Sequence, residues 1–187
     1  MNWKNQMRRY SLILVLLLLY SCSGPTPRKP ASHQTQSFMV ESVNLNKKIN
    51  SIEEDAIKYY IARDSGSNYY NSPNGFWYKY LIQSDETNPI PSIGDEVEFE
   101  YEISDLLDNV IYSNETLGVQ KYSIDKENIE SGIQNGLKLM KEKEEVVFLF
   151  PSFSAFGFSG DKEKIGIKQP LIYKVKLNKI NRKNESN

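Results

Sequence analysis

The sequence predicts an α+β fold in which five or six antiparallel strands surround one short helix and a helical segment precedes them. Residues 97–103 and 171–180 alternate apolar with polar side chains, as antiparallel strands do when one face is buried. Residues 38–63 instead place apolar side chains three or four positions apart, which is the period of an amphipathic helix. Among the strands, Ile133 and Leu137 share a helical face with Met140 and predict the single short helix.

Residues 1–21 have the features of a signal peptide. Lys4, Arg8 and Arg9 form a basic start, and the nine residues 11–19 that follow are almost purely aliphatic. A helix needs about 20 apolar residues to span a bilayer, so a permanent transmembrane helix is not expected here.

The only cysteine, Cys22, lies where this aliphatic run ends. The string Leu19-Tyr20-Ser21-Cys22 resembles the lipobox of bacterial lipoproteins. That resemblance implies cleavage before Cys22, lipidation of its side chain and a lipid anchor to the membrane on the periplasmic or outer side of the cell envelope. An ordinary secreted protein with one stray thiol is the alternative.

Composition excludes several classes of function. Removing residues 1–21 leaves 20 Lys or Arg against 24 Asp or Glu, a formal net charge of −4, so no nucleic-acid partner is expected. With Cys22 lipidated, no disulfide or cysteine-based metal site can form. The single histidine, His33, is expected to be a solvated linker residue, since one histidine cannot build a metal site or a histidine-dependent triad. We therefore expect chemistry that needs neither a metal nor a cofactor.

The region between Cys22 and the strands falls into two parts. Residues 22–37 are rich in Pro, Ser and Thr and predict a flexible, lipid-anchored tether. Residues 38–66 predict an amphipathic helical segment, which could divide near Asn50 because Ser51 and Glu54 fit a capping box. Its narrow apolar stripe requires a partner, which could be its own domain, a second copy or an envelope complex.

Residues 64–75 have the composition of turns, and strands are predicted after them. The predicted strands are residues 76–82, 97–103, 110–112, 120–124, 146–150 and 171–180. The strand pattern is weaker at 110–112 and 120–124 than in the other four.

Five local strings in this order resemble the FKBP family of peptidyl-prolyl cis/trans isomerases. They lie at residues 74–79, 91–97, 132–141, 151–157 and 170–177, so the resemblance covers about residues 75–181 and leaves a tail at 182–187. The resemblance implies a half-barrel of antiparallel strands wrapped on the short helix, and proline-containing polypeptides as substrates. The Lys-Pro-Ala-Ser-His string at 29–33 and the Gly-Asp-x-x-Lys-Ile-Gly string at 160–166 are most similar to the GldI-like lipoproteins associated with gliding motility in Bacteroidetes.

The reaction itself fits a chain without conventional catalytic groups. Rotation about a peptide bond has a barrier of about 18–20 kcal/mol because amide resonance must be broken, while the two X-Pro isomers differ by only about 0.5–1 kcal/mol. A dry apolar pocket favours the twisted, less polar imide. Carried over position by position, the resemblance implies a pocket formed by Tyr101, Ile111, Ile129, Glu130, Ile133, Phe156, Ile165 and Tyr173. Each of these side chains could instead belong to the ordinary core.

Three positions depart from the family pattern. Tyr112 stands where active members usually have Asp, Phe156 where they have a Tyr hydroxyl, and Gln120 near an expected pocket aromatic. Each lost hydrogen bond would weaken catalysis by about 0.5–1.5 kcal/mol. Three functions therefore stay open: a working isomerase, an FKBP-fold chaperone or binding module of low activity, and a spacer that residues 38–63 dock into a membrane complex.

Overall fold

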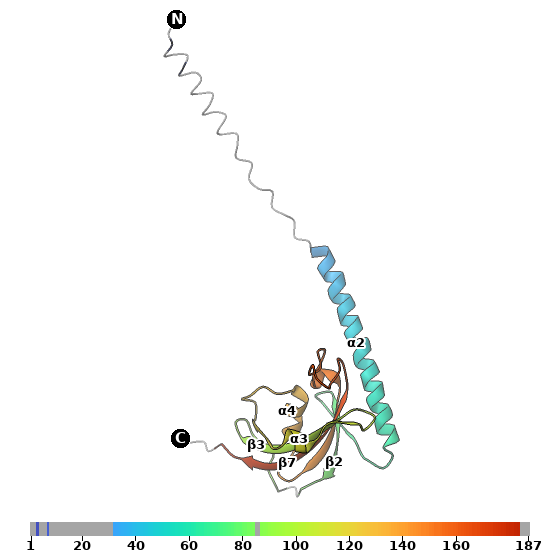
Figure 1. The fold of residues 1–187 in the computed structure, drawn as a ribbon, viewed down its shortest axis with the longest axis vertical. Helices are drawn as coiled ribbons and strands as arrows, with labels where there is room; N and C mark the ends of the chain where they lie inside the picture. The colour runs from blue at the N-terminus through green and yellow to red at the C-terminus, as the bar shows by residue number, and fades with distance from the viewer. Residues whose placement is uncertain (1–2, 4–6, 8–31, 85–86, 184–187) are drawn as a thin grey trace. The chain divides into compact units, whose positions relative to one another are not determined.

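The computed structural model describes residues 32–84 and 87–183, together with Trp3 and Met7 (Figure 1). The predicted signal peptide, Cys22 and the tether as far as residue 31 lie outside the described residues. Contacts within the chain define two units, residues 1–42 and residues 43–187, and the second unit contains the whole sheet.

The described chain begins with one long helix and continues as a sheet with short helical insertions. In chain order the elements are α2 (Ser32–Arg63), β1 (Tyr70–Ser72), β2 (Phe76–Ile82), β3 (Glu96–Ser104), β4 (Val110–Tyr112), α3 (Asn114–Leu117), β5 (Gln120–Ser123), α4 (Ser131–Leu137), β6 (Glu145–Phe150), the 3-10 turn η1 (Ser152–Ser154) and β7 (Leu171–Asn181). The predicted α+β class, with an antiparallel sheet and a preceding helix, is confirmed.

All strand pairs are antiparallel, and the order is β1-β2-β6-β7-β3-β4 with β5 also paired to β3. The sheet has seven strands in place of the predicted five or six, because residues 70–72 form β1 against the start of β2. Turn-forming residues on both sides of this segment concealed a strand of only three residues.

The sheet is covered on both faces. On one face, α4 packs through Ile133 and Leu137 on the main core, to which Phe148 of β6 and Tyr173 of β7 belong. On the other face, Ile57 of α2 and three strand residues form a second core, whose strand members are Val147, Leu149 and Ile172. Because both faces of β6 are buried, its sequence is a continuous apolar run without alternation.

Helix α2 is continuous and does not divide near Asn50. No Gly or Pro interrupts residues 32–63, and Glu54 pairs with Lys58 one turn later at 2.9 Å instead of closing a capping box with Ser51. The helix begins at Ser32, which lies inside the segment predicted as tether.

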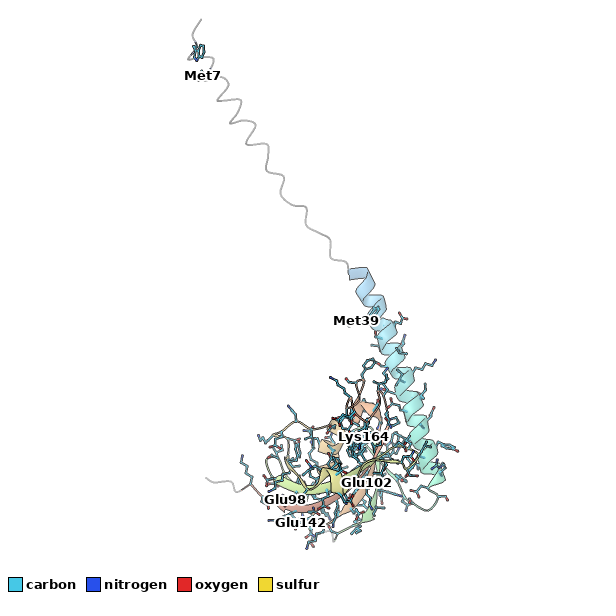
Figure 2. The ribbon with its side chains drawn as sticks, in the orientation of Figure 1. Met7, Met39, Glu98, Glu102, Glu142 and Lys164 are labelled. Carbon is cyan, nitrogen blue, oxygen red and sulfur yellow. The ribbon has the colours of Figure 1, made fainter. Side chains whose placement is uncertain are left out.

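Part of the apolar stripe of α2 packs on the sheet that follows it in the chain. Glu53 and Ile57 are buried, and Tyr60 and Ile61 are half-buried against the second core. Apolar side chains earlier in α2 are 50–73% exposed; they are Phe38, Met39, Val40, Val43, Leu45 and Ile52, of which Met39 is marked in Figure 2. No helix in the described ranges is long and apolar enough to cross a membrane.

Asp95 joins the start of β3 to the end of β7. Its carboxylate, 3% exposed, accepts hydrogen bonds from the backbone N–H groups of Ser92 at 2.8 Å and Lys183 at 2.9 Å and from Arg182 Nη1 at 2.7 Å. Desolvation alone would raise the pKa of Asp95, but these hydrogen bonds outweigh it and lower the pKa below its usual value.

Candidate active site

Side chains from six separate segments converge on the face of the sheet that carries α4. Seven of the eight predicted site residues belong to the main core, and we call these seven residues the aromatic site. Ile133, Ile165 and Tyr173 are buried, whereas four others are half-buried and pack against them: Tyr101, Ile111, Ile129 and Phe156. The eighth, Glu130, is the half-buried N-cap of α4 and directly follows Ile129.

Parallel rings of two tyrosines form the centre of the aromatic site. The rings of Tyr101 on β3 and Tyr173 on β7 stack with centroids 5.6 Å apart and an interplanar angle of 3°. Phe150 of β6 meets Tyr173 edge-on at 5.1 Å and 69°. Burial, followed by the nearby Glu130 carboxylate, raises the pKa of both tyrosines above the usual value.

Helix α4 approaches the sheet closely because Gly132 has no side chain. A Cβ built at Gly132 would lie 2.7 Å from the carbonyl oxygen of Ser154 and 2.8 Å from the ring of Phe150. This close approach places Ile133, which is 4% exposed, against the aromatic rings of the sheet.

Residues 157–168 form a loop that follows η1, and Gly160 and Asp161 determine its shape. Gly160 has φ of 62°, and a Cβ there would lie 2.1 Å from the carbonyl oxygen of Ile165. Asp161 Oδ1 accepts hydrogen bonds from the backbone N–H groups of Glu163 at 2.8 Å, Lys164 at 3.0 Å and Ile165 at 2.8 Å. The loop thereby carries Ile165 into the core, where it is 3% exposed.

Tyr112 joins this loop to β4. Its hydroxyl donates a hydrogen bond to Asp161 Oδ2 and lies 3.4 Å from Glu163 Oε2, while Lys164 Nζ sits 4.8 Å from the centre of the tyrosine ring. Lys164, marked in Figure 2, also donates to the carbonyl oxygen of Ile111 at 3.4 Å. We call these contacts between the loop and β4 the loop clasp: Tyr112 binds Asp161, and Lys164 binds the carbonyl oxygen of Ile111.

The hydrogen bond between Tyr112 and Asp161 shifts the pKa values of both side chains. Desolvation would raise the pKa of Asp161, but hydrogen bonds from Tyr112 and from the loop N–H groups outweigh it and lower the pKa to about 2. The same hydrogen bond is the main cause that raises the pKa of Tyr112 to about 12. From the sequence, Tyr112 was interpreted only as the loss of an aspartate; the Gly-Asp-x-x-Lys-Ile-Gly string was the available signal that the loop supplies one.

Gln120 lies beside the aromatic site and takes no part in its cluster. Its Nε2 donates to the carbonyl oxygen of Leu117 at 2.6 Å, and Leu117 of α3 packs on the main core. The sequence interpretation did not include Leu117, because a four-residue helix gives too few positions to show a period.

Two surface hollows lie mostly outside the aromatic site. One, of about 260 Å³, is lined by charged and polar residues of β3, β6 and β7 and by Asn114, and it shares only Tyr101 with the predicted site. The other, of about 220 Å³, is lined by Asn88, Pro89, Glu142, Lys143, Ile180 and Arg182. Within residues 32–84 and 87–183, no group of three His, Cys, Asp or Glu side chains is placed to hold a metal ion.

Comparison with known proteins places the aromatic site inside one family domain. Residues 88–178 match the family model of the FKBP-type peptidyl-prolyl cis-trans isomerase, and all eight predicted site residues lie within that range. A probable FKBP-type peptidyl-prolyl cis-trans isomerase, FkpA, of Neisseria meningitidis serogroup B is 28% identical over 148 residues, which are 79% of this chain. The chain spans about half, 52%, of the length of that curated relative.

Two solved structures share the fold. A peptidyl-prolyl cis-trans isomerase from Pseudomonas syringae pv. tomato aligns with a TM-score of 0.58 at 18% identity, over 73% of this chain and 96% of that one. FkpA from Escherichia coli aligns with a TM-score of 0.59 at 17% identity, over 92% of this chain and 82% of that one. Residues 88–178 therefore match the FKBP-type peptidyl-prolyl cis-trans isomerase family model, and the chain shares its fold with the two solved structures.

Proposed function

We propose that this protein accelerates cis/trans rotation of X-Pro bonds in proline-containing polypeptides that are exported to the cell envelope. The observation that supports this most is the convergence of seven predicted pocket residues around the Tyr101–Tyr173 stack, within the matched family domain. These seven residues come from six separate segments of the chain, so folding is needed to bring them together.

The chemistry of the aromatic site suits rotation about an imide. A planar imide carries charge separation that water stabilises, so moving the X-Pro bond into apolar surroundings favours the twisted state. Rigid aromatic walls hold the proline ring while the rest of the peptide turns, which supplies orientation without a nucleophile. The loop clasp ties the loop of residues 157–168 to β4 beside Ile111, which is one of the seven residues of the aromatic site.

The test is a refolding reaction limited by proline isomerisation, with the chain lacking residues 1–22 as the added protein. The unit 43–187 has its own core, so this soluble form retains the folded domain. We expect the slow phase to accelerate in proportion to the amount of protein added. A slow phase unchanged from buffer at a large excess of the protein would contradict isomerase activity.

A second candidate is a chaperone or binding module with little turnover. Phe156 carries no hydroxyl, and the hydroxyl of Tyr112 is already bonded within the chain to Asp161, so neither side chain is ready to orient a substrate carbonyl. This candidate predicts saturable binding of an unfolded, proline-rich polypeptide without acceleration of the slow phase, measured in the same preparation.

We further propose that Cys22 is lipidated and anchors the domain to the envelope membrane, in a GldI-like protein linked to gliding motility. The signal-like residues 1–21 and the strings at 29–33 and 160–166 support this proposal. Feeding cells an alkyne-bearing fatty acid should label the wild-type protein but not Cys22→Ala. Equal labelling of both would contradict a lipid on Cys22.

We expect α2 to contact a gliding or envelope complex, or a second copy of the chain. The contact would use the exposed apolar residues that precede Glu53 in the helix. Analytical ultracentrifugation of the chain lacking residues 1–22, compared with a Val43→Asp, Leu45→Asp variant, tests the second copy. Identical monomeric sedimentation of the two proteins would leave only a heterologous partner.

A further inference from the structure

Tyr173 carries a hydroxyl that has no partner inside the protein. Within the described parts of the chain, Tyr173 Oη is the one buried side-chain nitrogen or oxygen that forms no hydrogen bond with another protein group. The residue is 1% exposed. An unpaired buried polar group destabilises a fold by about 1–3 kcal/mol, and folded proteins contain few of them.

The contacts of Tyr173 show that the ring alone would satisfy the packing. Its ring stacks on Tyr101 and meets Phe150 edge-on, and a phenylalanine would make both contacts equally well. The hydroxyl adds no bond to another described group of the chain, so its hydrogen-bond partner comes from outside the protein, as water or as a bound molecule.

The surroundings of the hydroxyl indicate where that group would lie. Burial raises the pKa of Tyr173 first, and Glu130, Tyr101 and Asp161 raise it further. These three residues come from the start of α4, from β3 and from the loop of residues 157–168. The geometry agrees, because the ring that carries this hydroxyl stacks on Tyr101 at 5.6 Å and packs in the same cluster as Ile133 and Phe156.

We propose that the Tyr173 hydroxyl donates a hydrogen bond to the carbonyl oxygen of the X-Pro bond held in the aromatic site. This inference rests on the proposed isomerase function, for which it identifies the hydrogen-bond donor to the substrate. An X-Pro carbonyl that enters an apolar site leaves its water behind and needs a donor, and the hydroxyl needs an acceptor. Pairing the two satisfies both groups and helps to position the X-Pro bond in the aromatic site.

The test is Tyr173→Phe, assayed for kcat/KM on a proline-containing peptide and for stability in urea. We expect kcat/KM to fall about two- to tenfold, the size of one neutral hydrogen bond. The urea midpoint should stay the same or rise, because the variant no longer buries an unpaired hydroxyl. If the hydroxyl only stabilised the fold, Tyr173→Phe would lower the urea midpoint.

Tyr122→Phe is the matched control. Tyr122 is also 1% exposed in the main core, but its hydroxyl accepts the backbone N–H of Asp125 at 3.1 Å and it is not one of the site residues. This variant should lower the urea midpoint while leaving kcat/KM unchanged.

A substrate with a C=S group in place of the X-Pro carbonyl identifies the acceptor, since sulfur accepts hydrogen bonds weakly. The wild-type protein should favour the oxygen peptide over the sulfur peptide by a larger kcat/KM ratio than Tyr173→Phe does. Equal oxygen-to-sulfur ratios in the two proteins would show that the X-Pro carbonyl is not the acceptor. Equal kcat/KM of wild type and Tyr173→Phe on the oxygen peptide would overturn the role of the hydroxyl, while isomerase function would stand. An inactive wild-type protein would overturn both.

Discussion

At the scale of single residues, the loop clasp joins two side chains that lie far apart in the sequence. Tyr112 and Asp161 are 49 positions apart in the chain, yet the tyrosine hydroxyl donates to the carboxylate. The clasp brings the carboxylate of Asp161 to the end of the Tyr112 side chain, which stands where the resemblance implied an aspartate. An aspartate introduced at position 112 would instead lose this hydrogen bond and add a third carboxyl group near Asp161 and Glu163.

Tyr112→Phe should raise the pKa of Asp161 toward its ordinary value, because one hydrogen bond to the ionised carboxylate is lost. In the wild-type protein this carboxylate stabilises the fold above its unfolded pKa of 3.8, and the contribution disappears as pH falls toward about 2. In the variant the loss should occur at higher pH. Carboxyl carbon NMR shifts measured during an acid titration check this, and equal pKa values in the two proteins would contradict it.

Phe156→Tyr should raise kcat/KM about two- to tenfold, the effect of adding one neutral hydrogen bond to the substrate. The same assay on Phe153→Tyr is the control, since Phe153 is in the same segment but 52% exposed and outside the aromatic site. A rise from near-zero activity would identify the natural domain as mainly a binding module. No change would show that position 156 does not reach the peptide.

At the scale of elements, helix α2 is tied to the segment that carries Phe156. The buried Glu53 carboxylate accepts hydrogen bonds from Ser152 N at 2.7 Å and from Ser152 Oγ at 2.8 Å. The carbonyl oxygen of Ser152 in turn accepts the N–H of Gly157 at 2.8 Å, so the turn around Phe156 is built on the residue that Glu53 holds. A helix outside the matched family range thus contributes to one wall of the aromatic site.

Glu53→Gln should lower the free energy of unfolding by about 1–3 kcal/mol, since a buried charge-assisted hydrogen bond to Ser152 is replaced by a weaker one. The matched control is Glu54→Gln, which alters only the exposed pair with Lys58 and should change stability much less. Urea unfolding compares the two variants. Equal small losses would show that the contact with Ser152 does not stabilise the fold.

At the scale of the whole domain, apolar side chains on both faces of the sheet are covered by helices. One face is covered by α4 and the other by the last turns of α2, where Ile57 is fully buried with Leu149. The folded unit is therefore larger than the family match at residues 88–178, and it includes the end of the helix.

Two truncations test this boundary. A chain that begins at Asn50 retains Glu53 and Ile57 and should unfold at nearly the same urea concentration as the chain lacking residues 1–22. A chain that begins at Asp64 exposes the apolar side chains of Val147, Leu149 and Ile172 and should lose several kcal/mol, about 25 cal/mol for each Å² newly exposed. It should also bind a hydrophobic dye. Equal stability of the two truncations would show that α2 is not part of the folded unit.

Local patterns in the sequence were sufficient for the class of fold and the main elements. Alternation in residues 97–103 and 171–180 predicted the long central strands β3 and β7, and the spacing of Ile133 and Leu137 predicted α4, because period is a property of neighbouring residues. The family resemblance supplied the eight site residues, and the structure brings seven of them into one cluster. Their role in catalysis stays a prediction.

Contacts between distant residues decided the rest. The pairing of Tyr112 with Asp161, the hold of Glu53 on Ser152 and the unpaired hydroxyl of Tyr173 each depend on groups brought together only by folding. The sequence also left three partners open for the α2 stripe, since a helical period shows which face is apolar but not what covers it. Tertiary structure placed the end of that stripe on the domain's own sheet, because the apolar faces of β6 and β7 would otherwise be exposed to water.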